Sequence, residues 1–255
     1  IRLSLVGSEM CIRDSLRVLI LQIICPCLKK VYCRLNIFKI FRFLKLMQNK
    51  ETRFFELALE SNALQLGDFT LKSGRKSPYF FNIGSFFNEG YIKELAELYA
   101  VHILENELDF NLIFGPAYKG IPLAASVAAS LSSKVNRPIP FAFDRKEVKS
   151  HGEGGKVVGN LKDKKVLIVD DVLTAGTAIK QSVEIIHQAK GKVSCCLVAL
   201  DREEVIDDIL ARDKILREIE VDVFSIAQIS RLVDFFESNN QHKEASIINK
   251  YINSQ

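Results

Sequence analysis

Two adjacent carboxylates, Asp170 and Asp171, directly follow the apolar run 166–169. In parallel α/β sheets, ligands bind at the carboxyl ends of strands, so the two acids stand where a site is expected. The next segment is rich in small and hydroxyl-bearing residues and is predicted to open a helix. Its members are Val172, Leu173, Thr174, Ala175, Gly176, Thr177 and Ala178. Backbone N–H groups and hydroxyls at a helix N-terminus form a phosphate cradle, and the helix dipole favours the anion.

A pair of acids beside a phosphate cradle suits a ligand that carries both hydroxyls and phosphate. A ribose phosphate meets both conditions, because carboxylates accept hydrogen bonds from vicinal hydroxyls while the loop takes the 5′-phosphate. Mg²⁺ can offset the remaining charge.

An apolar strand that ends in two acids is also similar to the Walker B strand of nucleoside triphosphatases. That interpretation requires a G-x-x-x-x-G-K-[ST] loop, and although Gly115 and Gly120 have the required spacing, Ile121 stands where Lys is needed. The sequence also lacks G-x-G-x-x-G, so neither a triphosphatase nor a dinucleotide-binding fold has much support.

A regular alternation of apolar runs and amphipathic stretches is expected to position these residues. Helices are predicted at 91–108, 120–131 and 177–189, and strands at 112–114, 140–143, 165–170 and 193–200. Near-continuous apolar strands alternating with helices are typical of a parallel sheet covered on both faces, so the sequence predicts an α/β fold. Before this region, a helix is predicted at 52–65, then a small antiparallel pair of strands at 69–71 and 79–83.

Three further segments accompany the acidic strand end, at 69–79, 114–122 and 145–155. Together with residues 166–178 they resemble, in order, the motifs of the type I phosphoribosyltransferases, and the likeness runs from about Asn49 to Tyr251. Within that family, the chain resembles the members that use orotate. The resemblance implies a pentosyltransferase that moves the phosphoribosyl group of phosphoribosyl pyrophosphate (PRPP) to orotate in pyrimidine synthesis, giving orotidine 5′-monophosphate and pyrophosphate. It also implies that Mg²⁺ is bound mainly through PRPP.

The resemblance assigns roles to individual residues. Catalytic roles fall on Lys149, His151, Asp170 and Asp171. PRPP would contact Lys72, Tyr118, Lys119, Arg145, Lys146, Lys149, His151, Asp170, Asp171 and the loop 172–178. Orotate would contact Lys72 and the Phe80 and Phe81 backbone, which belong to a small hood at about 66–90, together with Thr174 and Arg202.

The segment 145–160 resembles the mobile lid loop of the family, whose cations reach pyrophosphate in the neighbouring subunit. Its glycines, Gly152, Gly154 and Gly155, provide hinge freedom, and its cations could order the loop around an anion. The resemblance therefore implies a homodimer.

Residues 1–46 differ in charge from the rest of the chain. They hold nine Lys and Arg residues against two acids, a charge of +7, whereas residues 47–255 hold 26 basic and 29 acidic residues. The basic surplus is confined to one end, so it does not predict nucleic-acid binding. The apolar run 16–28 contains Arg17, Gln22 and Pro26 and is too short and polar to span a membrane.

We expect residues 1–46 to be either a cleaved leader or translated upstream sequence outside the native protein. The chain opens with Ile, and Met47 stands just before the first amphipathic helix. Residues 47–255 are expected to form a single domain.

Other residues receive structural interpretations. Cys195 and Cys196 are adjacent on a predicted strand, where side chains point to opposite faces, so we expect reduced thiols in a cytoplasmic protein. His102, His187 and His242 are given no function. The charged segment 201–220 is expected to be a solvated helix face.

Two other functions remain open. A PRPP-sensing regulator would keep the phosphate cradle but lack Lys72 and the lid cations, and this chain has both. A transferase specific for purines should differ in the hood.

Overall fold

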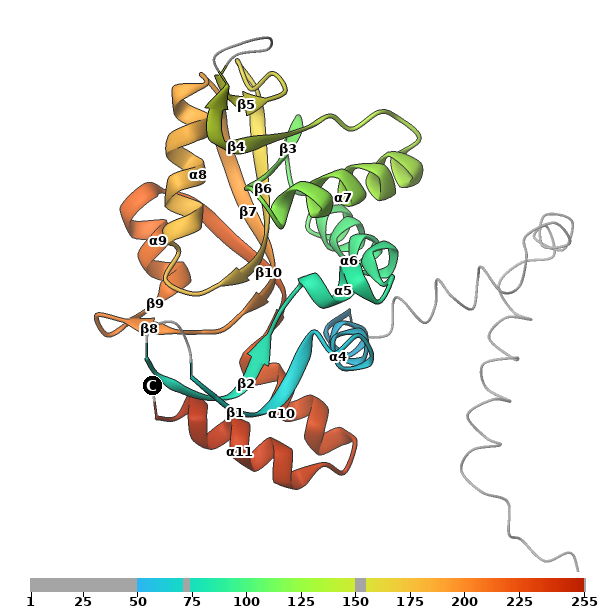
Figure 1. Ribbon diagram of the computed structural model, residues 1–255, viewed down its shortest axis with the longest axis vertical. Helices are drawn as coiled ribbons and strands as arrows, with labels where there is room; N and C mark the ends of the chain where they lie inside the picture. The colour runs from blue at the N-terminus through green and yellow to red at the C-terminus, as the bar shows by residue number, and fades with distance from the viewer. Residues whose placement is uncertain (1–49, 71–73, 150–154, 255) are drawn as a thin grey trace, which may run out of the picture. The chain divides into compact units, whose positions relative to one another are not determined.

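A computed structural model of the chain describes residues 50–70, 74–149 and 155–254, without the side chains of 147–149 and 155 (Figure 1). The chain divides into two units, Ile1–Met47 and Gln48–Gln255, and every element described below belongs to the second.

Six strands of the described residues form one sheet in the order β10-β7-β6-β3-β4-β5. They are β3 (Leu112–Gly115), β4 (Phe141–Lys149), β5 (Gly155–Val158), β6 (Lys165–Leu173), β7 (Lys192–Asp201) and β10 (Asp222–Gln228). All neighbours are parallel except β4 and β5. The predicted α/β fold with a parallel sheet is therefore confirmed.

Helices cover both faces of this sheet (Figure 1). One face carries α6 (Ile92–Glu105) and α7 (Gly120–Val135), and the other carries α8 (Thr177–Gln188) and α9 (Ala211–Ile219). The predicted apolar stripe of α8, made by Ile179, Val183 and Ile186, is buried in the same core cluster as Ile168 and Val198 of the sheet. Burial of both sheet faces explains why β6 and β7 read as continuous apolar runs.

The N-terminal elements of this unit form the hood and its support. The helix α4 (Lys50–Glu60) is followed by β1 (Leu64–Thr70) and β2 (Lys76–Phe81), which pair antiparallel, and by the short helix α5 (Gly84–Asn88). The expected hairpin is confirmed, but the helix predicted at 52–65 ends five residues early. Asn62 adopts a left-handed φ of 53°, and Leu64 and Gln65 pair with Phe81 and Phe80 instead of continuing the helix.

The segment predicted as a loop at 145–160 is partly a hairpin. Strand β4 extends to Lys149, and β5 pairs with it from Gly155 to Val158. The prediction was wrong for these flanks because the pairing of Phe143 with Val158 and of Asp144 with Val157 continues the sheet outward. Residues 150–154, which include the predicted hinge residues Gly152 and Gly154, lie outside the described part of the chain.

The segment 201–220, predicted as a solvated helix face, is a helix only in its second half. Asp201, Arg202 and Glu204 are buried, and a small hairpin of β8 (Val205–Ile206) and β9 (Ile209–Leu210) precedes the helix α9. The prediction was wrong for 201–210, because Asp201 pairs with Arg212 and Glu204 pairs with Arg75 instead of facing water. It was right for α9, a helix whose charged residues at 213, 217 and 218 are exposed.

Two C-terminal helices, α10 (Ile229–Ser238) and α11 (His242–Ile252), complete the unit and pack on each other; α10 also contacts α4, and α11 contacts β2. Cys195 and Cys196 are buried free thiols, as expected. Across the described ranges, no helix is long and apolar enough to cross a membrane.

Candidate active site

The two acids of β6 lie at the point where the chain order of the sheet reverses. From β3 the chain proceeds to β4 on one side, and from β6 it proceeds to β7 and β10 on the other. In open α/β sheets, ligands bind at the carboxyl ends of the strands beside such a reversal. The loop after β3 and the loop after β6 therefore face each other across a common site.

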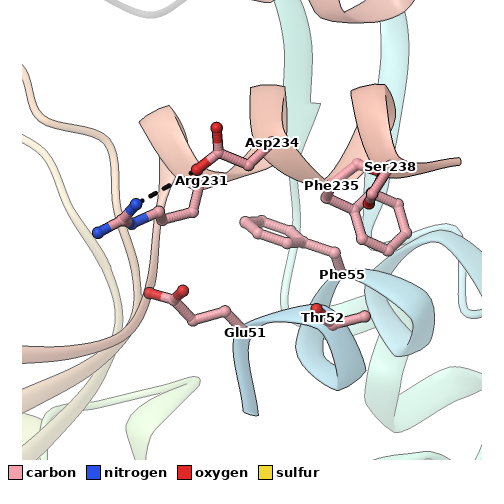
Figure 2. A pocket seen from close by; sticks show the side chains of 7 residues that line it. All are labelled: Glu51, Thr52, Phe55, Arg231, Asp234, Phe235 and Ser238. Carbon is pink, nitrogen blue, oxygen red and sulfur yellow. Dashed lines mark hydrogen bonds and ion pairs between the residues drawn. The ribbon is translucent and has the colours of Figure 1, made fainter. Parts of the chain in front are cut away.

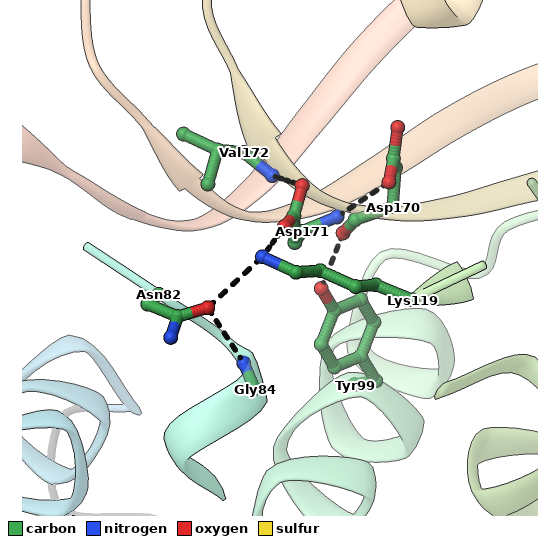
Figure 3. Close-up of polar contacts among 7 residues, drawn as sticks. All are labelled: Asn82, Gly84, Tyr99, Lys119, Asp170, Asp171 and Val172. Atoms are coloured by element: carbon green, nitrogen blue, oxygen red, sulfur yellow. Dashed lines mark hydrogen bonds and ion pairs between the residues drawn. The ribbon is translucent and has the colours of Figure 1, made fainter. Parts of the chain in front are cut away.

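Local hydrogen bonds hold Asp170 and Asp171 in place (Figure 3). The backbone N–H of Asp171 donates to Asp170 Oδ1 over 2.9 Å, and the N–H of Val172 donates to Asp171 Oδ1 over 2.8 Å. The hydroxyl of Tyr99 on α6 donates to the Asp170 carbonyl over 2.7 Å. The strand end is thus fixed both by its own backbone and by a helix on one face of the sheet.

Burial makes ionisation of this pair costly. Burial, and secondly the charge of Asp171, raise the pKa of Asp170 to about 7, while the Asp171 N–H and Lys119 act in the opposite direction. Burial also raises the pKa of Asp171, and Lys119 is the main opposing influence. Two adjacent acids that resist ionisation, next to a lysine, are a typical functional-site signature.

Lys119 joins three segments at this point. Its Nζ donates to Asn82 Oδ1 over 2.9 Å and lies 3.8 Å from Asp171 Oδ2. Asn82 follows β2, and its Oδ1 also accepts the N–H of Gly84 at the start of α5 (Figure 3). The predicted PRPP residue Lys119 therefore lies beside the predicted PRPP residue Asp171, with the hood attached through Asn82.

Two glycines allow the loop that carries Lys119 to turn tightly after β3. A Cβ atom on Gly115 would lie 2.0 Å from the carbonyl oxygen of Gly120, and a Cβ on Gly120 would lie 2.7 Å from Pro116 Cδ. Buried Asp144, at the end of the apolar part of β4, accepts the N–H of Ala117 over 2.6 Å. The loop thus exposes Tyr118, 68% accessible to solvent, with Lys146 Nζ 5.9 Å from its ring centroid.

The loop after β6, predicted to cradle a phosphate, leads directly into a helix, as the sequence indicated. Thr174, Ala175, Thr177 and Ala178 are exposed, and α8 begins at Thr177 with no side chain of the described residues capping it. Gly176 has a φ of 74°, and a Cβ there would lie 2.4 Å from Ile215 Cδ1. The first N–H groups of α8 are therefore available for an anion.

The residues predicted to bind orotate are only partly brought together. The backbone N–H of Arg202 donates to the carbonyl of Leu173 over 3.3 Å, which places Arg202 next to Thr174. Its guanidinium Cζ lies 4.9 Å from the ring centroid of Tyr79 in β2. Phe80 is exposed, whereas the ring of Phe81 is buried in the core.

Three predicted site residues belong wholly or partly to segments outside the described part of the chain. Lys72 and His151 lie outside the described residues, as does the side chain of Lys149. A cavity of about 310 Å³ between the base of the hairpin and α8 is lined by the cations Arg145, Lys146 and Lys156 and by the acids Asp144 and Glu184, so cations outnumber acids there by one.

Sequence reasoning missed three residues that support the site: Asn82, Tyr99 and Asp144. Asp144 carries the same signal as Asp170, an acid directly after an apolar run, and could have been found. The other two act through contacts with distant segments.

A second cavity, of about 260 Å³, lies between α4 and α10 (Figure 2). Its walls include Glu51, Phe55, Arg231, Asp234 and Phe235, and none of the predicted site residues lines it.

Comparison with known proteins agrees with this geometry. A family model of the phosphoribosyl transferase domain matches residues 87–231, which defines the class of the fold and site. The orotate phosphoribosyltransferase of Kluyveromyces lactis is 44% identical over 80% of this chain and 95% of its own length. The orotate phosphoribosyltransferase of Marinobacter nauticus is 47% identical over 76% of this chain and 91% of its own length. The crystal structure of the enzyme from Francisella tularensis, 36% identical, superposes with a TM-score of 0.70 over 79% of this chain and 98% of that one. The chain belongs to the orotate phosphoribosyltransferase family of pentosyltransferases.

Proposed function

We propose that this protein transfers the phosphoribosyl group of PRPP to orotate, releasing pyrophosphate and forming orotidine 5′-monophosphate for pyrimidine synthesis. The observation that carries the proposal is the meeting of Asp171, Lys119 and the uncapped start of α8 at the reversal point of the sheet. These groups match the hydroxyls, the pyrophosphate and the 5′-phosphate of PRPP.

The reaction breaks the bond between C1′ of the ribose and pyrophosphate. It leaves positive charge on the sugar and negative charge on the leaving group, so preorganised charges suit it better than a protein nucleophile. In our proposal, Asp170 and Asp171 hold the ribose hydroxyls and stabilise the developing positive charge. Lys119 and Tyr118 receive the pyrophosphate, and the loop 174–178 holds the 5′-phosphate.

The residues present fit a Mg²⁺ that arrives with PRPP. Such an ion would be held mainly by the phosphates of PRPP, and Asp170 and Asp171 could complete its coordination with carboxylate oxygens. Among the described residues, no group of three or more His, Cys, Asp or Glu side chains could hold a metal alone. When bound, Mg²⁺ supplies positive charge to the pyrophosphate.

We further propose a homodimer in which Arg145, Lys146, Lys149 and His151 act on the pyrophosphate of the partner's site. The position of the hairpin supports this arrangement, since β5 is the last strand of the described sheet and the cavity at the base of the hairpin is lined by more cations than acids. Buried free Cys195 and Cys196 fit the reducing cytoplasm, where we place the protein.

A single assay tests the function. Purified protein is incubated with Mg²⁺, PRPP and, separately, orotate, uracil, adenine or hypoxanthine, and pyrophosphate release is followed. Of these four bases, we expect only orotate to cause the release of pyrophosphate. Release with a purine would identify a different transferase, and PRPP binding without release from any base would identify a regulator.

A further inference from the structure

A buried ion-pair cluster joins the hood to the end of β7. Glu204, 4% exposed, lies between two guanidinium groups. Its Oε1 is 3.2 Å from Nε of Arg202, and its Oε2 accepts a hydrogen bond from Arg75 of the hood. The carboxylate therefore links two segments that are 129 residues apart in the chain.

Arg202 has hydrogen-bonding capacity left over. It is 7% exposed and stacks on Tyr79, yet neither its Nη2 nor its Nε has a hydrogen-bond partner among the described residues, and the 3.2 Å contact of Nε with Glu204 is an ion pair. A buried donor without an acceptor is costly, and a guanidinium edge matches the geometry of a carboxylate. The Nη2 donor points to an acceptor-rich ligand.

The backbone places this donor at the phosphate loop. Arg202 N–H bonds to Leu173, directly before Thr174, and the carbonyl of Glu204 accepts the N–H of Ala211 at the start of α9. The position of Glu204 is therefore fixed by α9, while its side chain reaches across to Arg202 and the hood.

We infer that Glu204 is a positioning residue for base recognition, which holds the Arg202 guanidinium so that its unpartnered edge receives the carboxylate of the base. The inference rests on the proposed function and extends it, because it assigns the preference for a carboxylated pyrimidine to a residue that touches no substrate. Arg75 makes the same contact from the hood, so the hood and the base subsite are held together by one carboxylate.

The test compares orotate with uracil, which has the same ring but no carboxylate. Glu204→Gln keeps the shape of the side chain and removes its charge. We expect the KM for orotate to rise about tenfold or more, because interactions of charged groups are the strong ones, while the KM for PRPP changes less than twofold. The preference for orotate over uracil in equilibrium binding should fall by a similar factor.

The matched control is Glu203→Gln. Glu203 is next to Glu204 in the chain, but its carboxylate makes a different contact: it accepts the N–H of Ser230 at the start of α10 over 2.8 Å. This variant can lower the melting temperature but should leave the preference for orotate over uracil unchanged. A purely structural role for Glu204 would likewise lower stability without changing that preference.

A second variant keeps the inference testable if Glu204→Gln does not fold. Arg75→Met removes the hood partner, which is partly exposed, and leaves Glu204 to hold Arg202. We expect a rise of about threefold in the KM for orotate, with an unchanged KM for PRPP. If the wild-type protein uses orotate but both folded variants keep the wild-type preference, the inference is wrong and the proposed function stands. If the wild-type protein does not use orotate, the proposed function itself fails.

Discussion

Asp170 is expected to reduce the stability of the ligand-free protein at neutral and alkaline pH. Burial, and then the charge of Asp171, raise its pKa from 3.8 to about 7. A carboxyl whose pKa is higher in the folded than in the unfolded chain gives the folded state more bound protons between those two values. The free energy of unfolding therefore falls as the pH rises from about 4 to about 7 and remains at the lower value above pH 7.

Asp170→Asn removes this cost and keeps the Oδ1 atom that accepts the Asp171 N–H. A pKa that moves from 3.8 to about 7 corresponds to at most about 4 kcal/mol at pH 8. We expect the ligand-free variant to gain about 2–4 kcal/mol over the wild type at pH 8, and less than about 2 kcal/mol at pH 5. Activity should fall at the same time, since our proposal gives the carboxylate to the ribose hydroxyls.

Thermal unfolding of both ligand-free proteins between pH 5 and pH 8 measures this effect. In a domain of this size, 1 kcal/mol corresponds to about 2–4 °C, so the Tm of the variant should exceed that of the wild type by about 4–16 °C at pH 8. Asp208→Asn, at an exposed position, is the control and should change stability by less than about 0.5 kcal/mol. A variant that is less stable than the wild type at pH 8, or a difference that does not shrink toward pH 5, would refute the reasoning.

Three further predictions concern other parts of the molecule. Lys149→Ala should lower kcat by about 10²–10³ while changing PRPP binding little, and mixing it with chains defective at Asp171 should restore activity in hybrid dimers; steady-state kinetics that show neither effect argue against the shared lid. Gly176→Ala should weaken PRPP binding at least about tenfold in calorimetry, because its Cβ would collide with Ile215 and the left-handed φ disfavours a side chain; wild-type affinity would contradict the cradle. Burial lowers the pKa of His102 to about 4, so the folded state resists protonation and stability is lost as the pH falls from about 6.5 to 4. His102→Leu should reduce this loss by up to about 2 kcal/mol in acid unfolding curves. Identical curves for the variant and the wild type would exclude the effect.

The acids of β6 could be predicted from the sequence because the signal is local. An apolar run long enough for a buried strand, two carboxylates and a helix start are all contained in 166–178, and the structure places them as the pattern indicates. The partners of these acids could not be predicted in the same way. Asn82 and Tyr99 reach the site from the hood and from α6, and a single sequence does not show which distant residues meet.

The segment 201–204 shows how local reasoning can fail. Four consecutive charged residues are typical of a solvated surface, yet this run begins with Asp201, the last residue of the buried strand β7. The charges are compensated by residues outside the run: Asp201 pairs with Arg212 over 3.3 Å, and Glu204 pairs with Arg75. A charged run directly after a buried strand in an α/β fold is therefore better interpreted as part of the ligand-binding edge than as a surface helix.

The carboxyl edge of the sheet shows a common use of acids that goes beyond ligand contact. Three parallel strands of the sheet, β4, β6 and β7, carry the buried acids Asp144, Asp170 and Asp201. Each acid accepts a backbone N–H of the site, donated by Ala117, Asp171 and Glu203, respectively. Burial raises the pKa of both Asp170 and Asp201, so this edge shapes its loops with carboxylates that are costly to ionise. Since the cations Lys119 and Arg212 lie beside these acids, the same edge can hold a polyanion next to carboxylates, which is the requirement that a sugar pyrophosphate imposes.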